Sequence, residues 1–314
     1  MTSRIGSPPA ASDYTAQADW LELKALSAAD GNSSFQDFVA EVRRDGSTDA
    51  LQDSMDALVD TRGETSERLG DAVFSELEER ARAAGDGYPF SVGNQAIQLD
   101  SEALKAGSTY VFLLLLSKFG VEAGKGARVR PERDFEDISL AAAESYFGRN
   151  THDGSYLFAF PRRTPASGFP AAVDDLAQRL GEGGGAKPVT PAAQQKDAHL
   201  DVVVWHGFAD RRPGQIIAFG QCATGEKWTT KLSELPDTGR WGQAWMLQPP
   251  SVPAVRMFFV PHRPTREEWD TRATIGGVLF ERCRIAYHSP ELPANARARC
   301  IRWAEAVLAS KVRA

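Results

Sequence analysis

The sequence has few cysteines, no long apolar run and no excess of basic residues, and each absence excludes a class of protein. Its three cysteines, Cys222, Cys283 and Cys300, are odd in number and far apart, which argues against a disulfide framework and a cysteine-based zinc site. The longest apolar run, 110–116, is far shorter than the roughly 20 residues that span a bilayer. The first residues also lack the apolar segment of a signal peptide. We therefore expect a cytoplasmic protein that does not enter a membrane.

The formal net charge of −6 hides an uneven distribution of charge along the chain. Residues 1–120 contain 10 Lys and Arg against 20 Asp and Glu, a net charge of −10, and residues 121–314 contain 26 against 22, a net charge of +4. Because phosphate binding needs clustered basic side chains, the acidic average excludes a uniformly basic nucleic-acid coat protein. The acidic first part is expected to repel DNA and to contact a protein instead.

The hydrophobic pattern changes along the chain and predicts two domains. Apolar residues recur at helical spacing over 20–84, and glycines and basic residues cluster at 120–132, where this period stops. We therefore predict a helical N-terminal domain at 1–124, with residues 1–15 disordered, and a second domain at 125–314.

The second domain combines predicted strands and helices. Short runs rich in β-branched and aromatic residues predict strands at 200–205, 215–222 and 255–260. A glycine-rich segment at 181–188 predicts a flexible loop before the first of them. The segment 294–312 has the pattern of a terminal amphipathic helix. This alternation indicates the α/β class.

Three polar residues stand beside these predicted elements in an informative order. Glu136 lies at the start of a predicted helix, Asp201 precedes Val-Val-Val-Trp in the first strand, and Gln221 lies in Gly-Gln-Cys-Ala at the end of the second. This order resembles the PD-(D/E)xK nuclease superfamily, and within it the restriction-endonuclease-like branch of the Mrr type, over residues 133–260. The resemblance implies a restriction-endonuclease-like core, a central mixed sheet flanked by helices, which follows the helical N-terminal domain.

The resemblance further implies a magnesium-dependent site for phosphodiester hydrolysis. Mg²⁺, or Mn²⁺ in its place, prefers oxygen ligands, and the resemblance assigns these to Asp201, to the amide oxygen of Gln221 and to the backbone carbonyl of Cys222. Glu136 would contact the metal or its water shell. Such an ion polarises the phosphate and lowers the pKa of an attacking water.

The lysine of the family pattern is replaced in this chain. Ala223 stands at its position, and a methyl group neither orients nor activates a water. A long, flexible lysine from the following segment can reach back to the site, because lysine adapts its pKa readily in such surroundings. We predict that Lys227 is this substitute, with Lys231 as the alternative.

Other interpretations stay open from the sequence alone. Asp201 is also explained as the exposed start of a strand, and Glu136 as an acid that favours the first turn of a helix. The neutral Gln221 and the inert Ala223 are also typical of a catalytically inactive version of the fold, which binds nucleic acid or a partner protein as an assembly subunit. A Cys222 nucleophile paired with a histidine is a third interpretation, and a purely structural assembly protein is a fourth.

The activity implied by the resemblance is DNA cleavage by a deoxyribonuclease, in bacterial restriction or antiviral defence. The chain carries no Gly-x-x-x-x-Gly-Lys-Ser/Thr loop for ATP. Any ATP-driven step therefore needs an operon-encoded partner protein, for example an ATPase, which the acidic N-terminal domain would contact. The sequence leaves open whether the chain also forms a homo-oligomer.

Overall fold

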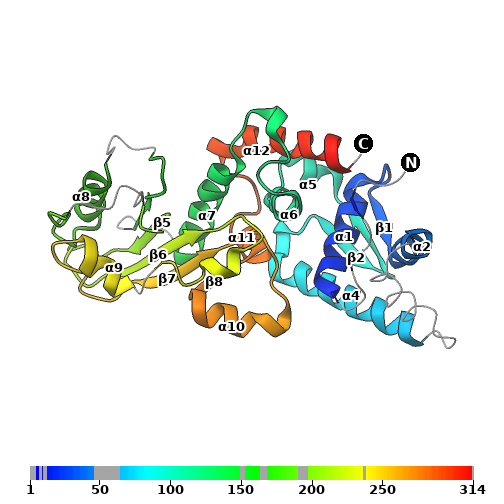
Figure 1. Ribbon diagram of the computed structural model, residues 1–314, viewed down its shortest axis with the longest axis horizontal. Helices are drawn as coiled ribbons and strands as arrows, with labels where there is room; N and C mark the ends of the chain where they lie inside the picture. Colours follow the sequence, from blue (N-terminus) through cyan, green and yellow to red (C-terminus); the bar gives the residue numbers. More distant parts are fainter. Residues whose placement is uncertain are drawn as a thin grey trace. The chain divides into compact units, whose positions relative to one another are not determined.

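The chain folds into two compact units in the computed structural model (Figure 1), which describes residues 5–6, 9, 13–45, 64–148, 153–162, 168–189, 197–235 and 238–312. One unit consists of Met1–Val129 and Pro290–Ala314, and the other of Arg130–Ser289. This division differs from the predicted domains 1–124 and 125–314, because the last segment of the chain belongs to the first unit.

The first unit combines helices with a small sheet, which the prediction of a helical N-terminal domain did not include. Strands β1 (Asn32–Ser34), β3 (Ala96–Leu99) and β2 (Phe90–Gly93) lie side by side in this order and are antiparallel. Asn94 and Gln95, both with positive φ, form the two-residue turn between β2 and β3, a conformation that matches the twist of a hairpin. The helices of this unit are α1 (Tyr14–Ser27), α2 (Phe35–Asp45), α4 (Glu64–Ala84), α5 (Ser101–Ala106), α6 (Thr109–Phe119) and α12 (Ala294–Val307), with 3₁₀ turns at Gly85–Gly87 and Lys125–Ala127 and a π-helical end at Leu308–Val312.

The described part of the segment 1–15, which was predicted to be disordered, contains ordered residues. Ile5 is buried, and Asp13 caps α1 because its side chain accepts a hydrogen bond of 2.8 Å from the backbone N–H of Ala16. For 1–4, 7–8 and 10–12 the prediction of disorder lies outside the described residues.

The apolar run 110–116 forms the buried helix α6. Ser108 caps this helix by accepting from the N–H of Val111, and Gly120, with φ of 69°, ends it. The rings of Phe112 on α6 and Trp303 on α12 lie 5.2 Å apart, which explains why the C-terminal helix belongs to the first unit. None of the helices in the described part of the chain combines the length and apolarity needed to cross a bilayer.

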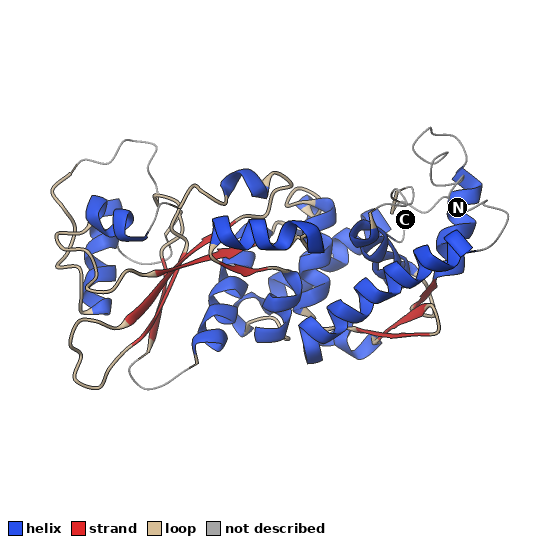
Figure 2. Cartoon of the chain, turned by 90° about the horizontal axis from the view of Figure 1, so that it is seen from below, coloured by secondary structure: helices blue, strands red, loops and turns tan. Residues whose placement is uncertain are grey.

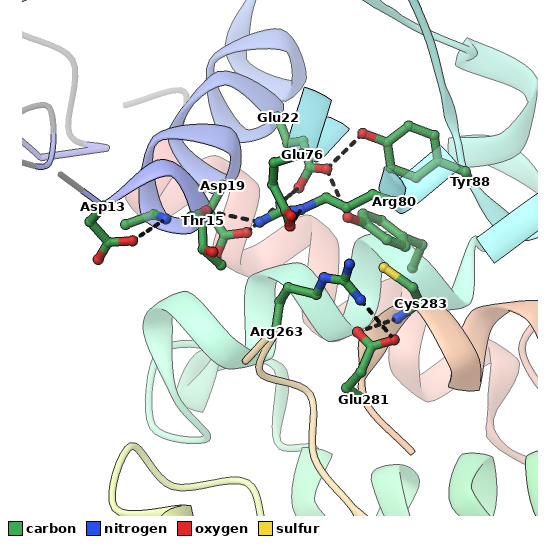
Figure 3. A network of polar contacts seen from close by, with 12 residues as sticks. Asp13, Thr15, Asp19, Glu22, Glu76, Arg80, Tyr88, Arg263, Glu281 and Cys283 are labelled. Carbon is green, nitrogen blue, oxygen red and sulfur yellow. Dashed lines mark hydrogen bonds and ion pairs between the residues drawn. The ribbon is translucent and has the colours of Figure 1, made fainter. Parts of the chain in front are cut away.

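A buried arginine links the helices of the first unit (Figure 3). Arg80 on α4 donates to Glu76 at 2.8 Å, to Asp19 at 2.7 Å and to Glu22 at 3.0 Å. A further bond of 2.8 Å joins its guanidinium to the backbone carbonyl of Thr15. The side chains of Arg80 and Glu22 are fully buried, so each charge depends on the other for its solvation.

The second unit is built on a mixed sheet of five strands, which confirms the α/β class. The order is β4 (Gly154–Leu157), β5 (Val202–His206), β6 (Ile216–Cys222), β7 (Val255–Phe259) and β8 (Val278–Phe280). The first three strands are antiparallel, and β6, β7 and β8 are parallel. Figure 2 shows the strands of both sheets in red. The three predicted strands are present as β5, β6 and β7, and the predictions missed β4 and β8.

Helices cover both faces of this sheet. Val203 and Phe219 belong to a buried cluster that also contains Trp241, and α8 (Phe169–Leu180) and α9 (Thr238–Trp245) contribute to it. Val202 and Val204 point to the opposite face, since successive side chains of a strand alternate. There α7 (Pro131–Phe147) packs on β4 and β5. The remaining elements are a 3₁₀ helix at Trp228–Lys231, α10 (Arg266–Gly276) and α11 (Arg282–His288).

The glycine-rich segment 181–188 is a loop, as predicted, and hydrogen bonds to other segments hold its backbone. Gly183 accepts from the N–H of Gln248, and Gly185 from that of Leu247, at 3.0 and 2.9 Å. The buried side chain of Glu182 accepts three backbone N–H groups, those of Gly214 at 2.8 Å, Gln215 at 3.3 Å and Ser251 at 2.9 Å. The glycines of this segment have positive φ, a conformation that glycine adopts without strain. Glu182 connects the segment to the loops that contain Gly214 and Ser251.

Replacing Glu182 by alanine is expected to lower the free energy of unfolding by about 1–3 kcal/mol, because it removes a buried carboxylate that is bonded to three backbone N–H groups and leaves those donors without this acceptor. Chemical denaturation of the variant beside wild type measures the change. Glu226→Ala, at an exposed position, is the matched control and is expected to change stability by less than about 0.5 kcal/mol. Equal stability of the two variants would contradict the role given to Glu182.

Candidate active site

The ends of two neighbouring strands bring the predicted residues Asp201 and Gln221 together. Asp201 directly precedes β5, and Gln221 and Cys222 end β6. Val202 pairs with Gly220, so the register places Asp201 opposite Gln221. The backbone N–H of Asp201 donates to the carbonyl of Gly220 at 2.9 Å. Asp201 and Gln221 are therefore neighbours because β5 and β6 pair as an antiparallel hairpin.

The Asp201 carboxylate is held in a desolvated environment. Its Oδ2 accepts a hydrogen bond of 2.7 Å from the backbone N–H of Cys222. Burial raises the pKa of Asp201 to about 7; the Cys222 N–H acts in the opposite direction, Asp197 raises the pKa further and the charge of Lys231 lowers it. A buried carboxylate of this kind is ionised at neutral pH only in part, and a nearby cation favours its charged form.

Glu136 lies on the helix that covers this end of the sheet. It is half-buried in the first part of α7. Burial raises the pKa of the Cys222 thiol well above its ordinary value, and the negative charges of Asp201 and Glu136 raise it further. Both carboxylates therefore act on the same point, the thiol of Cys222. This environment disfavours a thiolate and argues against the interpretation of Cys222 as a nucleophile.

The amide of Gln221 is fixed by two hydrogen bonds. Its Nε2 donates to Glu234 at 2.9 Å, and its Oε1 accepts from the backbone N–H of Leu235 at 3.2 Å. A carboxylate accepts only and an N–H donates only, so the orientation of the amide is determined. The amide oxygen that the prediction assigned to a metal is thus already bonded within the protein.

Glu234 and His199 belong to this site although the sequence interpretation did not include them. The Nδ1 atom of His199 lies 3.4 Å from Oε2 of Glu234, the oxygen that accepts from Gln221. His199 also follows Ala198 in a turn where both residues have positive φ, an uncommon conformation for residues other than glycine. Asp197 stabilises that turn by accepting from the N–H of His199 at 3.0 Å. In the sequence, an aspartate two residues before a histidine was the signal that could have indicated this turn.

The two candidate lysines differ in their relation to Asp201. Lys227, the predicted substitute, is exposed and precedes the 3₁₀ helix Trp228–Lys231. Lys231 ends that helix, and its positive charge acts on the Asp201 carboxylate. Ala223, at the position of the family lysine, is buried with 2% of its surface exposed. Lys231 is exposed as well, so the two lysines differ in the charge that acts on the Asp201 carboxylate and not in their exposure.

A magnesium ion at this site would depend on carboxylates and not on the predicted amide of Gln221. Oδ2 of Asp201 accepts from the backbone N–H of Cys222, and the charge of Glu136 acts on the Cys222 thiol. The backbone carbonyl of Cys222 is the third predicted ligand. Within the described residues, no group of three or more His, Cys, Asp or Glu side chains is arranged to hold a metal ion. Magnesium sites commonly use one or two carboxylates and leave other positions to water and phosphate. The fit therefore rests on Asp201 and Glu136, and Gln221 does not contribute its oxygen in this arrangement.

Comparisons with protein families, with curated proteins and with solved structures find no significant match to this chain.

Proposed function

We propose that the chain is a metal-dependent endonuclease that hydrolyses DNA phosphodiester bonds in bacterial restriction or antiviral defence. One observation carries the proposal: the half-buried Asp201 carboxylate lies at a strand end opposite Gln221, and the positive charge of Lys231 acts on it. A mixed sheet covered by helices on both faces is the scaffold that the resemblance to restriction endonucleases implies, and the restriction-endonuclease-like core is part of the same proposal.

Each residue of the site has a role in this proposal. Asp201 and Glu136 would hold a Mg²⁺ or Mn²⁺ ion together with the Cys222 carbonyl. The cation, when bound, polarises the scissile phosphate and lowers the pKa of the attacking water. Lys231 holds the attacking water and takes the role that the sequence interpretation gave to Lys227. Gln221 and Glu234 support the strand end beside Asp201.

The matched pair Lys231→Ala and Lys227→Ala tests this assignment. With supercoiled plasmid and Mg²⁺ or Mn²⁺, Lys231→Ala is expected to cleave about 10²-fold more slowly than wild type, the lower end of what a residue that orients or activates water contributes. Lys227→Ala is expected to retain the wild-type rate. Gel quantification of nicked and linear plasmid measures both. The opposite order of the two variants would return the role to Lys227.

A catalytically inactive module is the second candidate, and a specific observation favours it. Both polar atoms of the Gln221 amide are bonded within the protein, and Ala223 is buried. In that case the fold holds nucleic acid or a partner protein without cutting. The test uses wild-type protein with either metal, alone or with the products of neighbouring genes. DNA binding without cleavage under all of these conditions would favour this candidate over the nuclease.

The proposal includes a protein partner beside DNA. Residues 1–120 carry a net charge of −10, which disfavours contact with DNA and suits a basic protein surface. The partner, for example an ATPase, is expected to copurify with the full chain and to be released at high salt, because surface charge pairs are screened.

A further inference from the structure

A second polar pocket lies at the other end of β5 from Asp201. The strand runs from Val202 to His206, so the two ends are about 17 Å apart at roughly 3.3 Å per residue. The pocket has a volume of about 290 Å³. Among the residues that line it are two arginines, two glutamines and two aromatic residues: Arg179, Arg211, Gln178, Gln215, Trp205 and Phe208.

The two arginines reach the pocket from different elements. Arg179 lies in the last turn of α8, and Arg211 lies in the connection between β5 and β6 with φ of 55°. The Arg179 guanidinium is oriented by a 3.1 Å bond from its Nε to Asp175 and by the ring of Tyr156 at 5.2 Å. A guanidinium has five N–H donors, so four of them lie beyond that bond. Two guanidinium groups at one pocket are suited to a phosphate.

The aromatic side of the pocket offers a surface for stacking. Phe208 is 56% exposed, so its ring is accessible to a ligand. Base stacking on an exposed aromatic ring is a common way to hold a nucleotide without regard to its sequence. The amide of Gln178 adds a donor and an acceptor at the same pocket, and Nε2 of the buried Gln215 donates to the backbone carbonyl of Leu180 at 2.5 Å.

The acidic residue of the pocket is engaged by its neighbours. Oδ1 of Asp153 accepts from the backbone N–H of Gly207 at 3.1 Å and lies 3.0 Å from Nδ1 of His206. Asp153 therefore holds the end of β5, and the two arginines against this one carboxylate give the lining of the pocket a net positive charge.

We infer that this pocket binds a nucleotide, with its phosphate between Arg179 and Arg211 and its base on Phe208. The nucleotide is either free or one unit of a single strand, and the chemistry of recognition is the same for both. The inference does not depend on cleavage at Asp201, because a binding pocket at this end of β5 acts whether or not the other end is a nuclease site.

The test measures binding by the full chain in EDTA, so that no cleavage takes place. The probes are thymidine monophosphate, by calorimetry, and a fluorescein-labelled ten-nucleotide thymidine strand, by anisotropy. Arg211→Gly removes the side chain at a backbone conformation that glycine adopts easily, and Phe208→Ala removes the exposed ring. Both are expected to raise the dissociation constant by about tenfold or more. Arg212→Ala, the adjacent arginine that is not among the lining residues, is the matched control and is expected to change it less than threefold.

The outcomes distinguish the source of the nucleotide and decide the inference. If Arg211→Gly and Phe208→Ala weaken the binding of both probes, the pocket is a site for free nucleotides. If the two variants weaken the binding of the labelled strand alone, the pocket is a site for single-stranded nucleic acid. Wild-type protein that binds neither probe overturns the inference. Equal losses in Arg212→Ala and Arg211→Gly also overturn it, because they would indicate general charge attraction.

Discussion

Asp201→Asn is expected to lower the rate of DNA cleavage by about 10³-fold or more, because several kilocalories per mole of charge stabilisation at the phosphate depend on this carboxylate. Asparagine has nearly the same shape, and its carbonyl oxygen can still accept the N–H of Cys222, which Asp201 now accepts at 2.7 Å. The substitution therefore removes charge and preserves the strand end. Plasmid cleavage with Mg²⁺ or Mn²⁺ measures the effect.

Asp197→Asn is the matched control for this substitution. Asp197 lies in the same turn, acts on the pKa of Asp201 and accepts the N–H of His199 through Oδ1, a bond that asparagine also makes. A change of less than about threefold is expected for it. Cleavage that survives in Asp201→Asn would contradict the assigned site.

The Asp201→Asn variant is also expected to change how the stability of the protein depends on pH when EDTA is present. The pKa of Asp201 is raised from 3.8 to about 7 by burial, with Asp197 acting in the same direction and Lys231 in the other. Between these pH values the unfolded chain loses a proton that the folded chain keeps, so the stability of wild type falls as pH rises. Asp201→Asn should therefore match wild type at pH 4 and exceed its stability at pH 8, as measured by thermal unfolding. A variant less stable than wild type at pH 8 would show that the carboxylate is not desolvated.

Arg80→Met is expected to lower the free energy of unfolding by about 3–5 kcal/mol, because it leaves a buried carboxylate without its partner. The hydroxyls of Tyr88 and Tyr110 also donate to Oε1 of Glu22, at 2.8 and 2.7 Å. These two neutral donors remain in the variant but do not neutralise the charge. Chemical denaturation measures the loss.

Two further variants test the cause of that loss. Arg82→Met removes an exposed arginine of the same helix, whose contact with Glu78 at 3.9 Å is a surface ion pair, and is expected to change stability by less than about 0.5 kcal/mol. Glu22→Gln introduced into Arg80→Met is expected to restore part of the stability, since it removes the unpaired charge. If Arg80→Met were no more damaging than Arg82→Met, the buried network would not stabilise the fold.

Long, regular patterns in the sequence predicted their elements correctly, and short elements escaped prediction. The β-branched runs at 200–205, 215–222 and 255–260 are strands, because burial on both faces requires continuous apolar side chains. Strands β1, β2 and β3 have three or four residues each, too few to show an alternating pattern. The hydrogen bonds that hold the loop at 181–188 were not predicted, because a glycine-rich composition does not reveal that the single acidic residue Glu182 binds three distant backbone donors.

The sequence by itself determined the α/β class and the main strands of the second unit. It also determined the placement of Asp201 and Gln221 at the ends of adjacent strands. Hydrophobic periodicity and local spacing carry this information. Only the tertiary structure decided that Lys231 acts on Asp201, that Glu234 and Leu235 occupy the Gln221 amide and that the C-terminal helix packs in the first unit. Contacts between residues distant in the chain set these features, because burial, side-chain hydrogen bonding and ring packing follow from positions in space.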